Sequence, residues 1–229
     1  DMALAGGSEE SVNPICIAGF ANLGALAKVD DPTQASLPFD ERRCGFVAGE
    51  GAGAVVLESL EHALARGAKP LAEITGFGST GDAYHMTAPE PSGEGIQRAM
   101  LQALSEGGFT PADLGHVNAH GTATPANDST ESHALLALCG EEEGRKVPVV
   151  SVKGTTGHTL GAAGAVEAIV TALSVANECV PPTTGFAQPD PDCPVNVLTE
   201  AKTGYPQKVA LSNSLGFGGH NAVLAISPF

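Results

Sequence analysis

VNAHGTATP at residues 117–125 and KGTTGH at residues 153–158 are the two stretches that decide how this chain is interpreted. Each has a short apolar approach, which for the second stretch is residues 147–152, and each leads into a segment with helical character. Loops between a strand and a helix commonly carry chemistry because a rigid scaffold positions them. The sequence therefore predicts that His120 and His158 occupy equivalent loops, each just after a buried strand.

Strand and helix signals alternate through the rest of the chain. We expect strands at residues 2–5, 46–57, 71–77, 115–118, 149–152, 208–213 and 222–226. We expect helices at residues 20–27, 61–66, 95–106, 129–138 and 162–177. Such alternation predicts a layered α/β fold. The first strand is expected to be buried, and glycines in the second are expected to admit another backbone.

Composition and charge exclude several classes of protein. With 229 residues and 42% hydrophobic content, the chain can bury a core and is expected to be globular. A net charge of −15 argues against nucleic-acid binding, because no basic stripe is available to neutralise phosphates. No apolar run approaches the roughly 18 residues of a membrane span, and no basic segment leads into a hydrophobic one near residue 1. We expect a soluble cytoplasmic protein.

The cysteines and the remaining histidines suggest no metal centre. Five cysteines are scattered without a CxxC pair, so neither a disulfide framework nor a zinc site is expected. His85 and His220 are expected to brace loops. The other three histidines are expected to be solvated or to cap helices: His62, His116 and His133.

Two further motifs complete a pattern. They are GFGSTGDAYHMT at residues 76–87 and NSLGFGGHN at residues 213–221. Together with the two histidine loops, in this order and spacing, they resemble the β-ketoacyl-acyl-carrier-protein synthases of the elongating type II kind, which are thiolase-fold condensing enzymes. The resemblance covers essentially the whole chain. It implies a thiolase-like layered α-β-α-β-α fold, with the end of the N-terminal half at residues 1–70 and the C-terminal half at residues 71–229.

The activity implied by this resemblance is a decarboxylative Claisen condensation in fatty acid elongation. An acyl chain on an enzyme cysteine is joined to the carbanion left when malonyl carrier protein loses carbon dioxide. Two neutral imidazoles, His120 and His158, stabilise the negative charge on the thioester oxygen. Lys153 holds the site electrostatically and Glu167 is its carboxylate partner. Phe217 gates the site and offers its backbone N–H to the oxyanion.

The resemblance also implies how substrates are held. They arrive as malonyl and acyl thioesters on the phosphopantetheine of acyl carrier protein, so no separate cofactor and no metal are expected. The implied substrate-binding residues are Thr122 and Thr124 on the phosphopantetheine, Phe20 in the acyl pocket, and Thr87 with Asp82 in the third motif. Family members are homodimers. Gly24 replaces an arginine that often contacts the carrier protein, so docking is expected to rely more on Arg42, on Arg43 or on the half of the protein outside this chain.

The nucleophilic cysteine of the family matches none of the five in this chain. In the family it precedes the segment with which this sequence begins, at a turn into a helix. We therefore expect the chain to be a C-terminal portion that is inactive alone. Two alternatives stay open, a non-catalytic chain-length factor and a biosynthetic thiolase. Retention of His120, His158 and Lys153 favours the elongating enzyme.

Overall fold

A six-stranded mixed sheet lies at the centre of the structure, a computed structural model that describes residues 1–229. Its strand order is β3-β10-β9-β4-β5-β7. The bounds of these strands, in chain order, are β3 (Ala72–Gly81), β4 (Leu114–Asn118), β5 (Pro148–Val150), β7 (Asn196–Val197), β9 (Val209–Gly216) and β10 (His220–Pro228). Two other pairs of antiparallel strands stand apart from it: β1 (Met2–Glu9) with β2 (Gly51–Glu58), and β6 (Cys179–Val180) with β8 (Lys202–Thr203).

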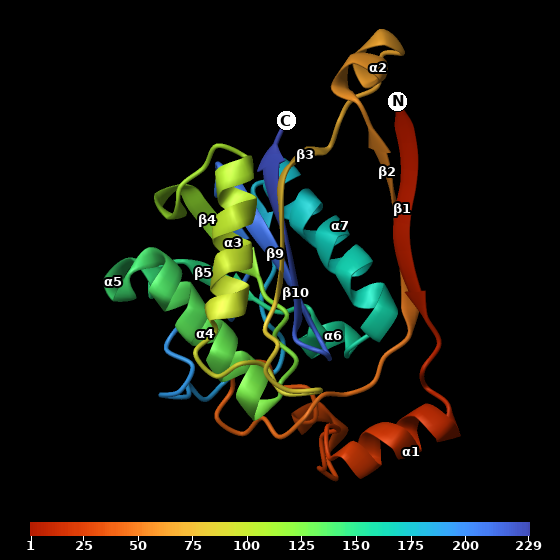
Figure 1. Cartoon of the computed structure of the whole chain (residues 1–229), viewed down its shortest axis with the longest axis vertical. Coiled ribbons are helices and arrows are strands. Elements are labelled where there is room, and N and C mark those ends of the chain that lie inside the picture. Colours follow the sequence, from red (N-terminus) through yellow and green to blue (C-terminus); the bar gives the residue numbers. More distant parts are fainter.

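Helices cover both faces of the central sheet (Figure 1). On one face lie α3 (Glu94–Glu106) and α4 (Pro125–Cys139), and on the other lies α7 (Ala163–Ala176), which also packs against β1 and β2. The shorter helices are α1 (Pro14–Leu23), α2 (Leu60–Ala65), α5 (Glu141–Gly144) and α6 (Lys153–Thr156), with 3-10 turns η1 (Pro32–Gln34), η2 (Pro111–Asp113) and η3 (Leu160–Ala162). The chain is thus layered in the order helix, sheet, helix, sheet. This arrangement confirms a layered α/β fold of the expected kind.

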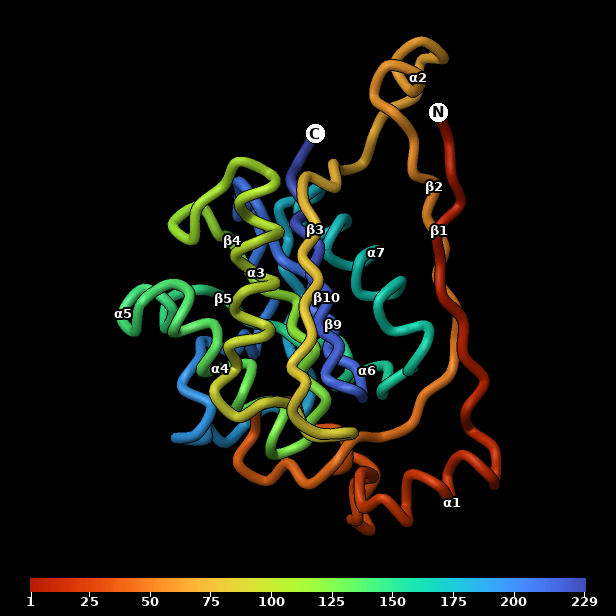
Figure 2. The backbone as a smooth tube through the Cα atoms, viewed as in Figure 1, coloured from red at the N-terminus to blue at the C-terminus, as the bar shows by residue number.

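The direction of the strands explains why the two histidine loops meet. β4 runs parallel to both β5 and β9. The carboxyl ends of neighbouring parallel strands emerge at the same edge of a sheet, where α/β proteins commonly place their sites. His120 follows the end of β4, and Lys153 follows the end of β5. In Figure 2 both chain termini lie toward one end of the long axis, and α1 lies at the other end.

The boundaries of several elements differ from the sequence prediction. The helix expected at residues 20–27 is α1, which begins earlier because Asn13 caps it: the Asn13 Oδ1 accepts the Cys16 N–H at 3.0 Å. It ends where Gly24 adopts a left-handed φ of 73°. The long strand expected from residue 46 begins only at Gly51, and residues 46 and 48 form isolated bridges instead.

The antiparallel pair of β1 and β2 is less buried than predicted. It lies along the outer side of α7 (Figure 1), and one of its faces packs on that helix. The other face is open, so the Leu4 side chain is 77% exposed and Val56 is 59% exposed. The expectation of a buried first strand was wrong because its apolar residues belong to both faces, and residues 1–229 cover only one.

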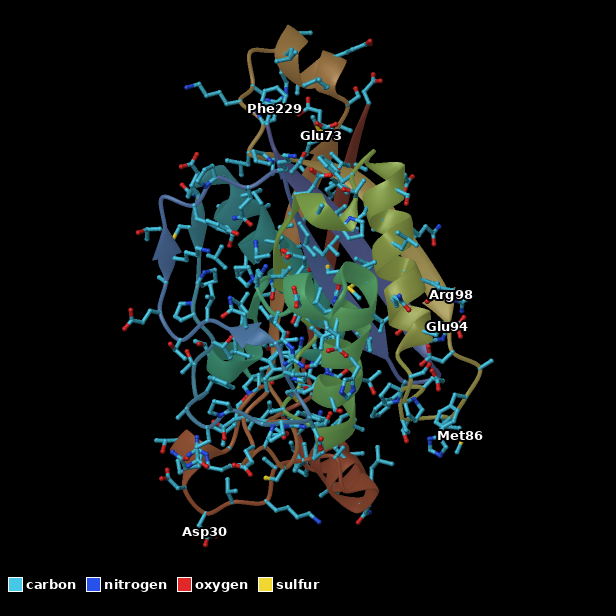
Figure 3. All side chains as sticks on the ribbon, turned by 90° about the vertical axis from the view of Figure 1, so that its left-hand side faces the viewer. Asp30, Glu73, Met86, Glu94, Arg98 and Phe229 are labelled. Atoms are coloured by element: carbon cyan, nitrogen blue, oxygen red, sulfur yellow. The ribbon has the colours of Figure 1, made fainter.

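The open edge of the central sheet is closed by side chains of α3. The backbone N–H groups of Phe77 and Ser79 on β3 donate to Glu106 Oε2 at 2.7 Å and to Gln102 Oε1 at 3.3 Å. This close approach requires glycine at position 78, because a Cβ there would lie 1.9 Å from the Ala99 carbonyl oxygen. Capping these donors protects an edge strand from pairing with another chain. After β3 the chain turns into a loop whose Met86 side chain projects into solvent (Figure 3).

His116 on β4 is fully buried, so the expectation of a solvated or capping residue was wrong. Its Nδ1 hydrogen bonds with Gln207 Oε1, and its Nε2 has no partner in the protein. Burial lowers the pKa of His116 to about 4, with the Gln207 contact opposing that change. Because residues 114–118 all lie in the interior, the strand has no solvent face on which a histidine could sit.

We expect acid to destabilise the protein partly through His116. In the unfolded chain its pKa returns to about 6.5, so the unfolded state binds the extra proton and stability falls as pH drops from about 6.5 toward 4. The full effect is about 3 kcal/mol, from 2.5 pKa units at about 1.36 kcal/mol each. Urea unfolding of wild type and His116→Gln at pH 7 and pH 4.5 measures it. If the free energy of unfolding changes equally with pH in the two proteins, His116 does not have this role.

Candidate active site

The imidazole rings of His120 and His158 meet at the carboxyl edge of the central sheet. Their ring centroids lie 5.1 Å apart and their planes are 84° apart, an edge-to-face arrangement. His120 is 6% exposed, and His158 is partly buried in the loop between α6 and η3. Both loops turn through glycine at positive φ, for example Gly157 at 67° beside His158. The two loops that the sequence placed after buried strands therefore bring their imidazoles together.

Hydrogen bonds assign the same tautomer to both rings. The Leu160 N–H donates to His158 Nδ1 at 3.2 Å, so the ring proton is assigned to Nε2. The Lys153 ammonium, which can only donate, lies 3.4 Å from His120 Nδ1 and makes the same assignment there. Each ring therefore carries its N–H at Nε2, the atom that these bonds leave free.

Both imidazoles are held in the neutral form. Burial, with a further contribution from the Lys153 charge, lowers the pKa of His158 to about 3. Burial is also the main cause that holds the pKa of His120 well below its ordinary value, with Lys153 and His158 adding to it. At neutral pH the two rings are thus uncharged hydrogen-bond donors.

Lys153 and Glu167 form a buried ion pair behind the two rings. The Lys153 side chain, at the start of α6, is 2% exposed, and Glu167, on α7, is 1% exposed. Lys153 Nζ donates to Glu167 Oε1. Burial raises the pKa of Glu167 to about 7, and the ammonium of Lys153 opposes that rise. A buried ammonium needs such a partner, because leaving it unpaired costs several kcal/mol.

A cavity of about 770 Å³ opens in front of the rings. Eight of the ten residues predicted to form the site line it: His120, His158, Phe217, Thr122, Thr124, Thr87, Phe20 and Asp82. The other two, Lys153 and Glu167, do not line it; Lys153 Nζ reaches His120 Nδ1 at 3.4 Å. The walls also include apolar side chains such as Phe46 and Leu23. A cavity with apolar walls and a few polar groups is typical of an enzyme site.

The predicted site residues differ in whether protein groups already occupy their hydrogen-bonding atoms. The hydroxyls of Thr122 and Thr124 hydrogen bond only to each other, at 2.8 Å, and face the cavity. Phe217, in the turn between β9 and β10, is 51% exposed, and its backbone N–H donates to no protein group. Asp82 is less available, because its two oxygens accept from the Glu90 N–H at 3.0 Å and from Asn221 Nδ2 at 2.6 Å.

Sequence reasoning missed Glu131, which fixes the first histidine loop. This buried carboxylate accepts the backbone N–H of His120 at 2.8 Å and that of Gly121 at 2.9 Å, and also the Nδ2 of Asn213 at 3.0 Å. A signal was present in the helix: Glu131 lies four residues before the core residue Leu135, so both share one face of α4. A carboxylate on that face points into the core.

The two arginines proposed for docking have different surroundings. Arg43 is only 8% exposed and is committed to Asp190 and to the Pro125 carbonyl oxygen, so its expected role in docking was wrong. Arg42 pairs with Asp40 at 2.7 Å and keeps a side chain that is 34% exposed. Only Arg42 of the pair can meet a partner.

One of the five thiols reaches the site. Cys44 is exposed and lines the cavity, a position that the sequence did not suggest. The other four cysteines do not line it. Burial raises the pKa of the Cys139 thiol to about 11 and that of Cys193 to about 12.

No helix of the chain combines the length and the apolar character that a membrane crossing requires.

Curated proteins resemble the chain along its whole length. It is 48% identical over 229 residues to 3-oxoacyl-[acyl-carrier-protein] synthase 2 of Staphylococcus aureus (strain COL), covering 100% of this chain and 55% of that protein. It is 46% identical over 227 residues to the protein of the same name from Synechocystis sp., covering 99% of this chain and 54% of the relative. The chain therefore spans about half the length of the curated relatives it matches.

Solved structures also match the whole chain. A β-ketoacyl synthase from Burkholderia phymatum STM815 superposes with a TM-score of 0.92 at 40% identity, covering 100% of this chain and 55% of the other. A structure of a type II PKS acyl-carrier protein in complex with its ketosynthase bound to the hexaketide gives 0.96 at 38% identity, covering 100% and 56%.

Family models describe most of the chain. Residues 1–63 match the N-terminal domain of β-ketoacyl synthase, and residues 71–187 match its C-terminal domain. The second match alone spans more than half of the 229 residues and contains both histidine loops, Lys153 and Glu167. The chain belongs to the β-ketoacyl synthase family.

Proposed function

We propose that the protein containing this chain is an elongating 3-oxoacyl-acyl-carrier-protein synthase of fatty acid synthesis. The observation that carries this proposal is the pair of neutral imidazoles, 5.1 Å apart, whose Nε2–H groups border one cavity. Two fixed neutral donors can stabilise an oxyanion without delivering a proton to the adjacent carbanion. The names of the curated relatives support the same reaction.

In the proposed reaction the carbon–carbon bond to the malonyl carboxylate breaks and carbon dioxide leaves. The electron pair of the broken bond moves toward the thioester carbonyl. The resulting enolate oxygen accepts hydrogen bonds from His120 and His158. Such preorganised donors in a dry site are typically the largest contribution to catalysis. The carbanion then attacks the acyl thioester carbonyl, and the enzyme thiolate leaves. The N–H of Phe217, which donates to no protein group, would donate to the oxyanion of this second step; its lack of a partner and its place on the cavity wall support that role.

The proposed substrates are acyl and malonyl thioesters on acyl carrier protein, with no separate cofactor. Thr122 and Thr124 would hydrogen bond the phosphopantetheine arm, and Phe20 would line the acyl pocket. A solved relative that contains a ketosynthase with its carrier protein supports this partner. We further propose a cytoplasmic homodimer. Arg42 is the cation that we assign to docking.

We propose that the acyl-carrying cysteine lies outside residues 1–229. Cys44 shares the cavity but follows Arg43 in a turn, without the helix N-terminus that lowers the pKa of reactive thiols. The test uses the complete protein and malonyl carrier protein labelled at the free carboxyl. We expect labelled carbon dioxide to be released, and cerulenin to modify a cysteine that is none of the five described here.

The outcomes separate the candidate functions. Release of carbon dioxide with a cerulenin label elsewhere supports the elongating enzyme. Labelling of Cys44 would move the nucleophile into this chain and contradict the proposal. A protein that neither releases carbon dioxide nor takes the label would instead be a partner subunit of the chain-length-factor type.

A further inference from the structure

Four aromatic rings form a continuous edge-to-face series that ends at the imidazole pair. Phe20 and Phe46 have ring centroids 5.2 Å apart with an interplanar angle of 77°. Phe46 and His158 are likewise 5.2 Å apart, at 73°. His158 and His120 complete the series at 5.1 Å. Phe46 is thus the one carbocyclic ring in direct stacking contact with His158.

The backbone on either side of Phe46 is held independently of the histidine. The Phe46 N–H donates to the Ala25 carbonyl oxygen at 3.0 Å, and the Phe46 carbonyl oxygen accepts the Ala27 N–H at 3.0 Å. The ring is 4% exposed. Phe46 therefore has a fixed position against which another side chain can be set.

The residues that follow Phe46 also fix the backbone of His158. The His158 N–H donates to the Val47 carbonyl oxygen at 2.7 Å, and the His158 carbonyl oxygen accepts the Gly49 N–H at 2.9 Å. A single chain segment, residues 46–49, thus contacts both the backbone and the ring of His158. This segment belongs to the part of the chain before β2, more than a hundred residues away in sequence.

The His158 ring needs this support because hydrogen bonding alone leaves it free to turn. Only its Nδ1 is bonded, to the Leu160 N–H, and its Nε2 must remain free if it is to meet a substrate. Rotation about the terminal side-chain torsion of histidine is broad, so packing must select the ring plane. The rings of Phe46 and His120 provide that packing on two sides.

We propose that Phe46 is a positioning residue: its ring holds the His158 imidazole in the plane that directs Nε2–H into the cavity and shields that imidazole from water. The proposal rests on the function assigned above and extends it to a residue of the cavity wall whose effect on the reaction passes through His158. Aromatic pairs of this geometry attract one another beyond the burial of their surfaces. Loss of that orientation is expected to lower the rate of the chemical step by ~10-fold.

The first test measures decarboxylation of malonyl carrier protein by the complete protein. Phe46→Leu, which keeps an apolar side chain without a ring, is expected to lower kcat by ~10-fold with KM changed by less than ~2-fold, because orientation and not binding is lost. Phe46→Tyr restores the ring and should recover most of the rate. The matched control is Phe109→Leu, a partly buried aromatic on the core cluster and outside the cavity, which should behave like wild type.

The second test needs no turnover, so it stays informative if the proposed reaction is wrong. The His158 ring is titrated by NMR with labelled histidine; its charged or titratable neighbours are Lys153 and His120. Wild-type His158 should stay neutral to about pH 3. Phe46→Leu admits water and should raise its pKa by ~1 unit or more, whereas Phe109→Leu should leave it unchanged.

An unmoved titration together with a wild-type rate in folded Phe46→Leu would overturn the positioning role. If the His158 titration is shifted in Phe46→Leu but the wild-type protein shows no decarboxylation, the positioning role stands and the proposed function is rejected. If Phe46→Leu fails to fold, Phe46→Met, which is closer in volume, takes its place in both measurements with the same expected results.

Discussion

His158→Ala is expected to lower malonyl decarboxylation by about 10²- to 10³-fold, the usual cost of removing one oxyanion donor. The effect is large because the His158 ring is neutral and already oriented, so its N–H meets the developing charge without reorganisation. His120→Ala should behave similarly. The double variant should be little worse than either single variant, since two donors that act on one oxygen function as a unit.

The measurement is release of labelled carbon dioxide by the complete protein, with His133→Ala as the control. His133 is exposed on α4 and does not line the cavity, so its loss should leave the rate unchanged. The same assay from pH 8 to pH 5 should show no acid loss from imidazole protonation, because the pKa of His158 lies near 3. Activity of His158→Ala within 10-fold of wild type would falsify the two-imidazole mechanism.

Glu167→Leu is expected to cost about 3–5 kcal/mol of unfolding free energy, because it leaves the Lys153 ammonium buried without its partner. Lys153→Met should cost less. With the ammonium gone, Glu167 can become neutral by taking a proton, since burial already raises its pKa to about 7. The charged carboxylate is then penalised only as pH rises. Stability of Lys153→Met should therefore decrease with rising pH above the unfolded value of about 4.5.

Urea unfolding midpoints of the complete protein measure these differences. The matched variant is Lys153→Met with Glu167→Leu, which removes both charges and fills the space with apolar side chains. It should recover most of the lost stability without recovering decarboxylation. If Glu167→Leu is as stable as wild type, the pair contributes little, and the role of Lys153 beside His120 needs another explanation.

Local sequence patterns were sufficient to predict the strands and loops that carry the site. The alternation of apolar runs with helical segments predicted strands near β4, β5 and β9, because buried strands and amphipathic helices leave periodic signatures in any context. The glycine-rich loops around His120 and His158 were placed correctly because they follow such strands. Boundaries were less accurate: β9 and β10 extend closer to Phe217 than predicted, since a tight hairpin joins them.

Contacts between distant parts of the chain could not be predicted in this way. The carboxylate of Glu131 reaches Asn213, 82 residues away, and Arg43 reaches Asp190, 147 residues away. Neither partner is marked by local periodicity. The same reason explains why Arg43 was assigned to the surface: an arginine is buried only when a carboxylate from elsewhere in the fold comes to meet it.

The amino-acid sequence by itself determined which elements form and that each histidine sits in a glycine-rich loop after a strand, because these depend on near neighbours along the chain. The tertiary structure alone decided the charge and direction of the imidazoles. Neutrality comes from burial beneath helices and loops far apart in sequence. Direction comes from the Leu160 N–H, held at an unusual φ of 42°, and from the Phe46 ring, which only the packed fold brings against His158.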